Sequence, residues 1–208
     1  SIIAHFPEAI ISVDTFQPEV AEKMLELGAH IINDVYAGRY LGEGDRRMFE
    51  LARQFSAPLM LMHMQGTPAN MQRSPVYEEV ISDIYQFFIE RLRIAREVDV
   101  HDIVLDPGFG FGKTLTHNTT LLRDFSQFTE LGYPLLAGIS RKSMLTKLFA
   151  TDERPATLPG QTAMHLHLLQ SGARILRVHD VAATKQAVDV WEVLSSKQPV
   201  IPREVGGA

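Results

Sequence analysis

Six short, nearly continuous apolar runs recur along this 208-residue chain, and each ends at or near a polar side chain. Runs of this length and composition are typical of strands buried on both faces of a parallel sheet. Helical patterns such as 18–25 and 77–97 lie between them, and Gly28, Gly132 and Gly172 mark helix ends before the next run. The sequence therefore predicts a βα unit repeated six times, with strands over residues 10–14, 31–35, 58–64, 103–107, 134–140 and 174–180.

Two α/β architectures accommodate six such units, an open doubly wound sheet and most of a (βα)8 TIM barrel. An open sheet gathers its ligand groups near one switch point, whereas a barrel brings all its strand ends to one mouth. Because polar groups follow all six runs, the barrel is favoured. We expect two N-terminal units to be absent from the sequence, one incomplete barrel domain over 1–195, and a loosely ordered tail over 196–208.

Composition limits the partners. The net charge of -5 without a basic run argues against nucleic acid. No apolar stretch approaches the roughly 18 residues of a membrane span, and residues 1–20 lack the pattern of a signal peptide. The chain has no cysteine, which excludes disulfides and thiolate metal sites and fits a reducing compartment. We therefore expect a cytoplasmic protein that binds neither nucleic acid nor membranes.

The segment VLDPGFGFGKT, residues 104–114, is rich in glycine and ends in Gly-Lys-Thr, as a nucleotide phosphate-binding loop does. Pro107 occupies the position of the first Walker glycine, and the glycine spacing G-x-G-x-G does not fit the dinucleotide fingerprint. Its glycines permit positive φ and close backbone approach, and Phe109 and Phe111 alternate with them. A ligand loop after the strand that ends at Asp106, and a flexible surface loop with incidental aromatics, both remain open.

Three apolar runs end in a carboxylate or carboxamide, at Asp14, Asn33 and Asp106. Such groups at one mouth suit a ligand with adjacent donors and acceptors, for example the edge of a heterocycle. Each of them alone is more simply explained as a helix N-cap. The three together favour a ligand site. Met62, at the end of the third run, either packs under a flat ring or fills the core.

The turn from Gly138 to Ser143 leads from an apolar run into a helical pattern at 144–149. A helix N-terminus that carries Ser140, Arg141 and Lys142 can bind an anion through backbone donors and charge together. A solvated basic turn is the alternative. Arg177 and His179 alternate onto one side of their strand end, and this pair indicates a phosphorylated substrate. A structural histidine is the alternative for His179.

Metal ligands are not evident. His165 and His167 are two residues apart on a predicted helix, so their side chains face different ways. We predict no metal ion held by protein ligands.

Together these stretches resemble the dihydropteroate synthase family of pterin-binding enzymes. The similarity runs in family order from residue 11 to about 194, and its motifs are ISVDT (11–15), GAHIINDV (28–35), LMHMQGTP (61–68), LDPGFGFGK (105–113), GISRKSM (138–144) and RVHDV (177–181).

The resemblance implies a homodimeric (βα)8 transferase that joins 6-hydroxymethyl-7,8-dihydropterin pyrophosphate to p-aminobenzoate with Mg2+ assistance in folate biosynthesis. Pyrophosphate would leave first, in an SN1-like route, and the arylamine would then attack. The implied roles are pterin binding by Asp14, Asn33, Asp106 and Lys142, pyrophosphate binding by Arg177 and His179, aminobenzoate binding by Ser140 and Arg141, and a pocket wall from Phe109 or Phe111.

The chain departs from the family pattern in one respect: it lacks the Asn-bearing and Arg-Pro-Gly segments of the first two strands, so the family's Asn ligand to Mg2+ is not in this sequence. We expect Mg2+ to be held through the substrate pyrophosphate. Two other readings stay open. A methyltetrahydrofolate-binding methyltransferase shares the barrel and the acids but has no need of Arg177 with His179. A non-catalytic pterin-binding module would be compatible with an incomplete barrel.

Overall fold

The computed structural model describes residues 2–149 and 157–196. Its six strands form one parallel sheet in the order β1 to β6, so that each strand pairs with its neighbour in sequence. This confirms the six predicted strands, although each is shorter than its apolar run because the flanking residues already belong to the loops. The strands are β1 Ser12–Asp14, β2 Ile31–Asp34, β3 Leu59–Met62, β4 Ile103–Asp106, β5 Leu135–Ala137 and β6 Ala173–Leu176.

Helices follow the strands as the pattern predicts. Pro18 opens α2, where a missing backbone N–H costs nothing, and Gly28 and Gly172, with positive φ, follow α2 and α7. Among the described residues, no helix is both long and apolar enough to cross a membrane. The predicted tail lies, apart from Ser196, outside the described residues. The helices are α1 Ile2–His5, α2 Pro18–Glu26, α3 Arg47–Phe55, α4 Val80–Glu97, α5 Leu115–Arg123, the 3-10 helix η1 Phe125–Leu131, α6 Ser143–Phe149, α7 Leu158–Gln170 and α8 Val181–Ser195.

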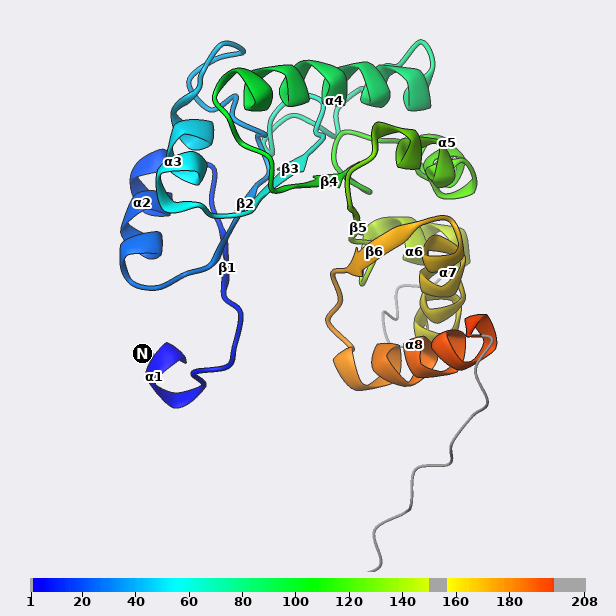
Figure 1. The fold of residues 1–208 in the computed structure, drawn as a ribbon. Coiled ribbons are helices and arrows are strands. Elements are labelled where there is room, and N and C mark those ends of the chain that lie inside the picture. The colour runs from blue at the N-terminus through cyan, green and yellow to red at the C-terminus, as the bar shows by residue number, and fades with distance from the viewer. Residues whose placement is uncertain (1, 150–156, 197–208) are drawn as a thin grey trace, which may run out of the picture.

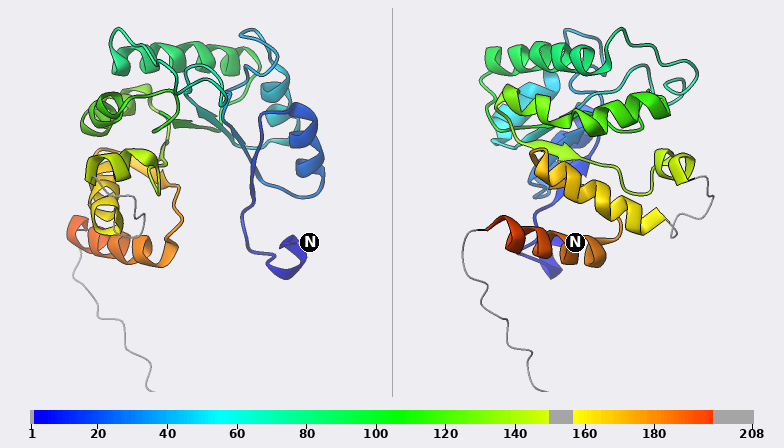
Figure 2. Two further views of the ribbon diagram at one scale, coloured as in Figure 1. Left: turned by 180° about the vertical axis from the view of Figure 1, so that it is seen from behind. Right: turned by 90° about the vertical axis from the view of Figure 1, so that its right-hand side faces the viewer.

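The sheet curls into a half-barrel, with the helices around its outside (Figures 1 and 2). Its edge strands are β1 and β6. The curvature brings their carboxyl ends together, since Arg177, just after β6, donates to the Asp14 carboxylate at 3.1 Å across 163 residues of sequence. This curvature confirms the barrel-type α/β fold that was predicted from the strand ends.

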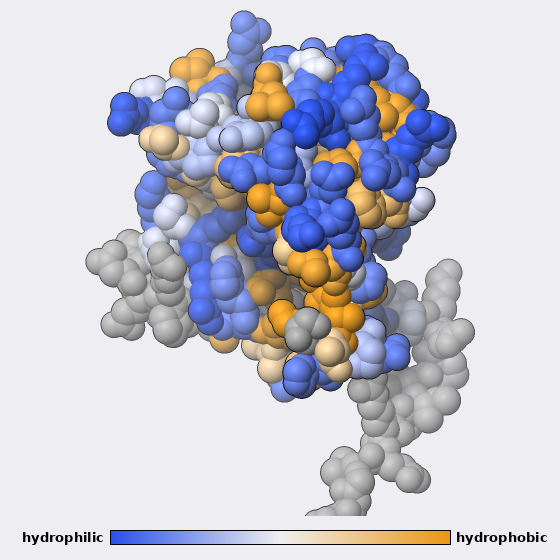
Figure 3. Space-filling model, turned by 90° about the vertical axis from the view of Figure 1, so that its left-hand side faces the viewer, coloured by the Kyte–Doolittle hydropathy of each residue, from blue (hydrophilic) through white to orange (hydrophobic). Residues whose placement is uncertain are grey.

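Burial differs between central and edge strands. All residues of β3 and β5 are buried, whereas β1 alternates between exposed and half-buried residues. The prediction of burial on both faces is therefore wrong for β1 and also for β6, which contains an exposed and two half-buried residues, because both strands lie at an edge of the sheet and have a neighbouring strand on one side only. Apolar residues gather on the face that carries α1 and β1 (Figure 3), where the large exposed ones are Ile2, Phe6 and Ile10.

The core lies between the sheet and the outer helices. Along α4, Ile84, Phe88 and Leu92 recur every four residues, so they lie on one face of the helix, and all three are buried. Phe88 meets Phe128 of η1 edge to face, with ring centroids 6.1 Å apart. Burying a side chain of this size stabilises the fold by about 2 kcal/mol, and this packing fixes the back of the loop that follows β4.

Candidate active site

The carboxyl ends of the strands align in register at one side of the sheet. Asp14 of β1 lies opposite Asn33 of β2, and Met62 of β3 lies opposite Asp106 of β4. The predicted convergence of these four residues on one edge is what parallel pairing produces. Met62 itself is buried within β3.

Asp106 is the buried acid of this edge. It is 6% exposed, and its Oδ1 accepts a hydrogen bond from the Gly108 N–H at 2.8 Å. Burial raises the pKa of Asp106, while the nearby Lys142 cation and the Gly108 hydrogen bond act in the opposite direction. A buried carboxylate with an oxygen still able to accept is suited to receive hydrogen bonds from a ligand.

Residues 108–112, Gly-Phe-Gly-Phe-Gly, form a loop that we call the glycine loop. A Cβ on Gly108 would lie 2.0 Å from the His63 carbonyl oxygen, and one on Gly112 would lie 2.5 Å from that of Gln65. Both glycines have positive φ. The loop therefore needs glycine at these positions, because its backbone packs directly against the segment that follows β3.

Side chains bind every backbone carbonyl of the glycine loop. Lys113 donates to the Gly108 and Phe111 oxygens at 2.9 and 3.1 Å, Lys142 to the Phe109 oxygen, Gln72 to the Gly110 oxygen at 2.5 Å, and Tyr77 to the Gly112 oxygen at 2.8 Å. In addition, the Gly110 N–H donates to Asn118 at 2.7 Å. Of the two possibilities left open by the sequence, the geometry favours a fixed ligand loop over a flexible surface loop.

The two phenylalanines of the glycine loop have different environments. Phe109 is fully buried and stacks on Phe125 with ring centroids 6.1 Å apart, so it belongs to the core. Phe111 is half-buried, and the Lys142 ammonium lies 4.5 Å from its ring centroid. Of the pair proposed as a pocket wall, Phe111 is the one whose ring lies beside a candidate ligand group.

Lys142 lies in the turn between β5 and α6. Burial is the largest influence on its pKa, which falls to about 8 although the Asp106 carboxylate opposes the shift. Gly138, earlier in the turn, has ordinary contacts, since a Cβ added there would lie 3.7 Å from Arg177 Cβ and 3.9 Å from Lys142 Nζ. The turn therefore approaches both Asp106 at the end of β4 and Arg177 after β6.

Ser140 and Arg141 of that turn are both bound to the segment after β6. Ser140 is buried, and its Oγ accepts from the His179 N–H at 3.2 Å and lies 3.0 Å from His179 Nδ1. Arg141 pairs with Asp180 at 2.5 Å, and this pairing raises the pKa of Arg141. Ser140 thus lies beside His179 and Arg141 beside Asp180, so both residues connect the turn to the segment that carries the predicted anion pair.

Arg177 and His179 stand at the open side of the site. The Arg177 and Asp14 side chains are 56% and 50% exposed and are joined by an ion pair. The Arg177–Asp14 ion pair is therefore accessible to solvent, in contrast to the glycine loop. Asp14 engages the Arg177 guanidinium at Nη2, so the remaining N–H groups of the fork can donate to an anion.

Sequence reasoning missed the roles of two buried polar residues around the site, Lys113 and Gln161. Lys113 is 3% exposed and binds His63, which follows β3. Gln161 of α7 accepts from the backbone N–H of Arg141 at 2.9 Å, and Arg141 has a left-handed φ of 55°. Lys113 follows the glycines directly, so its position was visible; nothing local indicated Gln161, which lies 20 residues from its partner.

Asp34 is a further buried polar residue near the site. It closes β2 and is fully buried, where it accepts from the backbone of Tyr36 and Gly38 at 2.8 and 2.7 Å. Burial raises its pKa to about 6. Asp34 therefore fixes the loop that follows β2 through these hydrogen bonds, and Asn33 is the residue of this strand end that we assign to a ligand.

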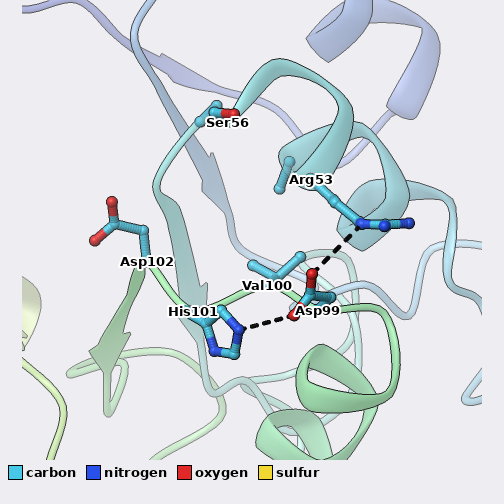
Figure 4. Close-up of a pocket in the computed structure, with 8 residues that line it drawn as sticks. Arg53, Ser56, Asp99, Val100, His101 and Asp102 are labelled. Atoms are coloured by element: carbon cyan, nitrogen blue, oxygen red, sulfur yellow. Dashed lines mark hydrogen bonds and ion pairs between the residues drawn. The ribbon is translucent and has the colours of Figure 1, made fainter.

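A surface hollow lies at the other end of the sheet. It has a volume of about 610 Å³, and its lining includes Ser56, Ala57 and Asp102, which precede β3 and β4 (Figure 4). Its charged side chains pair with each other, Asp99 with Arg53 and His101. The hollow contains none of the residues that converge at the carboxyl ends of the strands, so we assign the site to the latter.

A curled parallel sheet with a buried acid, a half-buried lysine and an exposed arginine at the carboxyl ends of its strands is the arrangement of a barrel enzyme that binds a polar, anionic ligand there. The model of the family described as "Pterin binding enzyme" matches residues 1–179. The chain belongs to this family.

Within the family, the chain is similar to dihydropteroate synthases. It is 42% identical over 201 residues to the Escherichia coli enzyme, an alignment that covers 94% of this chain and 68% of that protein. Two structures of the Thermus thermophilus enzyme, one in complex with 6HMPPP and one with 4-aminobenzoate, superpose with a TM-score of 0.84. They are 41% and 42% identical, and the matches cover 90% and 89% of this chain and 73% and 71% of theirs.

Proposed function

We propose that this chain is the dihydropteroate synthase of its source, a transferase that joins 6-hydroxymethyl-7,8-dihydropterin pyrophosphate to p-aminobenzoate. The observation that carries the proposal is the pairing of two unlike regions at one edge: a buried acid and lysine beside an exposed arginine. A ring with hydrogen-bond donors fits the first region, and a diphosphate fits the second. The Thermus relatives bound to 6HMPPP and to 4-aminobenzoate support both substrates.

In the pterin region, Asp106 accepts from the pyrimidine edge of the ring. Its fixed position, set by the Gly108 N–H, means that the carboxylate does not have to reorganise when the ring binds. Asn33 and Asp14 offer further polar groups from β2 and β1, and Lys142 donates to a ring acceptor.

In the diphosphate region, Arg177 and His179 bind and stabilise the leaving group. Departure of pyrophosphate in an SN1-like step leaves a pterin cation, and the Asp14 and Asp106 carboxylates stabilise this positive charge. The aminobenzoate amine then attacks, so no covalent bond to the protein is needed. The attacking nitrogen then loses a proton, which leaves a neutral amine in the product.

Aminobenzoate binding is assigned to the turn that carries Ser140 and Arg141, next to Phe111. In the free protein the Arg141 guanidinium is engaged by Asp180. The carboxylate of the substrate is therefore in competition with Asp180 for this cation, or accepts from backbone N–H groups at the start of α6.

We propose that Mg2+ binds together with the substrate diphosphate. Among the described residues, no three His, Asp or Glu side chains lie close enough together to hold a metal ion. The donors that remain are the diphosphate oxygens, where Mg2+ would neutralise charge. The residues of this chain act on the diphosphate through Arg177 and His179.

Homodimerisation and a cytoplasmic location complete the proposal. The large apolar residues exposed on α8 are Val181, Val190, Val193 and Leu194, and a second copy of the chain would cover them. The absence of cysteine fits a reducing compartment.

The test is pyrophosphate release by the 208-residue chain with Mg2+ and the pterin pyrophosphate, with and without p-aminobenzoate. Release that depends on p-aminobenzoate is expected. A chain that binds the pterin but releases nothing under either condition would instead be a pterin-binding module, and transfer of a methyl group from methyltetrahydrofolate would identify the methyltransferase alternative.

A further inference from the structure

Lys113 is a buried lysine for which the proposed chemistry has no use. Its side chain points away from solvent, and its Nζ lies 3.0 Å from His63 Nδ1, 2.9 Å from the Gly108 oxygen and 3.1 Å from the Phe111 oxygen. Three acceptors thus surround the three N–H bonds of an ammonium group. The backbone oxygen of His63, at 3.5 Å, is a weaker fourth neighbour.

Lys113 and Asp106 bind the same residue from two sides. Asp106 accepts from the Gly108 N–H, and Lys113 donates to the Gly108 carbonyl. Because Gly108 also packs against the His63 backbone, it cannot move without disturbing both charged groups. The position of the acid is therefore coupled to the presence of the lysine.

Burial lowers the pKa of Lys113 well below its ordinary value, and the Asp106 carboxylate acts against this shift. In turn, Lys113 is one of the cations that hold down the pKa of Asp106, together with Lys142 and Arg177. The other titratable neighbours are His63, whose pKa burial and Lys113 lower, and Tyr77, whose pKa burial raises. Arg39 contributes at the far side of His63.

We propose that Lys113 is a positioning residue for pterin recognition: it fixes the glycine loop through Gly108 and Phe111, and its charge keeps the Asp106 carboxylate ionised beneath the ligand. Only the ionised carboxylate accepts hydrogen bonds with both oxygens, whereas a protonated Asp106 would present a donor to the donors of the ring. The inference rests on the proposed pterin site, but it concerns binding of the ring and not turnover.

The experiment is titration of 6-hydroxymethylpterin into the full chain at a series of pH values from neutral toward acid, because burial raises the pKa of Asp106 above its ordinary value. In the unmodified protein, affinity should fall toward acid pH as Asp106 becomes protonated. In Lys113→Met, the midpoint of this fall should move to higher pH by about one unit, because a neighbouring cation is lost.

The matched control is Gln72→Met. Gln72 is exposed and binds the same loop at the Gly110 oxygen, so its loss loosens the loop without removing a charge. It should leave the midpoint in place. If Lys113→Met fails to fold, Lys113→Gln, which is neutral but keeps donor groups, should give the same displacement.

An unchanged midpoint in the Lys113 variants would overturn the proposal, and so would an equal displacement in Gln72→Met. Absence of pterin binding by the unmodified chain at every pH would contradict the proposed function itself. The two failures are therefore distinguishable.

Discussion

The site consists of two halves with opposite physical character. The buried half, His63, Asp106 and Lys113, has no residue more than 6% exposed, and its side chains bind each other or the glycine loop. The open half, Asp14, Arg177 and His179, is more exposed, and its one ion pair joins side chains that are at least half accessible to solvent. The first half lies at central strands of the sheet, and the second lies at its edges.

This difference corresponds to the demands of the two ligand parts. Recognition of a neutral ring depends on donors and acceptors that are fixed and cannot exchange to water, because a mismatch in a buried site leaves a group unpaired. A diphosphate that must leave is better held at an accessible place, where water and Mg2+ can reach it. The comparison therefore predicts separable effects on ring binding, on turnover and on stability.

Substitution in the open half should have the largest effect on turnover. Arg177→Ala should reduce pyrophosphate release on the order of 10³-fold, since it removes a charge that stabilises the leaving group, while the Kd for the bare pterin changes little. Turnover and pterin titration check the two quantities separately. The control is Arg177→Lys, which keeps the positive charge but loses the bidentate guanidinium. If Arg177→Ala reduced turnover and pterin binding equally, the two halves would not have separate roles.

A methyl group added to the glycine loop should have the largest effect on stability. Gly108→Ala places its Cβ against the His63 carbonyl at a residue with φ of 72°, which should lower the free energy of unfolding by about 3 kcal/mol. Gly138→Ala meets only ordinary contacts and should change it by less than about 1 kcal/mol. Urea unfolding measures both, and similar losses would mean that the glycine loop is not specially packed.

Asp106→Asn should weaken binding of the bare pterin about 10- to 100-fold, the range expected when a charged hydrogen bond is replaced by an opposing amide NH2. Isothermal titration calorimetry provides the measurement. Asp14→Asn in the open half is the comparison, and its smaller expected effect reflects solvent exposure. Unchanged affinity in Asp106→Asn would refute the role of this acid in ring recognition.

Away from both halves of the site, a pH-dependent effect on stability alone is expected at His165 of α7. Its ring is buried, neither ring nitrogen has a hydrogen-bond partner among the described residues, and burial lowers its pKa to about 4. Between pH 4 and the ordinary histidine pKa of about 6.5, the unfolded chain binds a proton that the folded chain does not, so this residue lowers stability as pH falls.

His165→Leu should therefore stabilise the protein, and by about 2 kcal/mol more at pH 5 than at pH 7, since the two pKa values bracket pH 5. Thermal or urea unfolding at the two pH values tests this. The same substitution at exposed His167 is the control. A gain that is independent of pH would show that packing, and not protonation, is responsible.

The sequence by itself determined the repeated strands, their order and the polar residues at their ends. Apolar runs report strands because burial on both faces leaves no alternation to obscure them, and parallel pairing then carries Asp14, Asn33 and Asp106 to one edge. The motifs around these residues also pointed to the family to which the chain belongs.

Only the tertiary structure decided which of these side chains are buried, and which bind one another. Phe109 and Phe111 alternate identically in sequence, yet one stacks in the core and the other lies beside Lys142. Gln161 meets Arg141, and Lys113 meets His63 across 50 residues. Such contacts depend on the curvature of the sheet and on the packing of the helices. Local sequence patterns do not indicate which segments that are far apart along the chain lie close together in space.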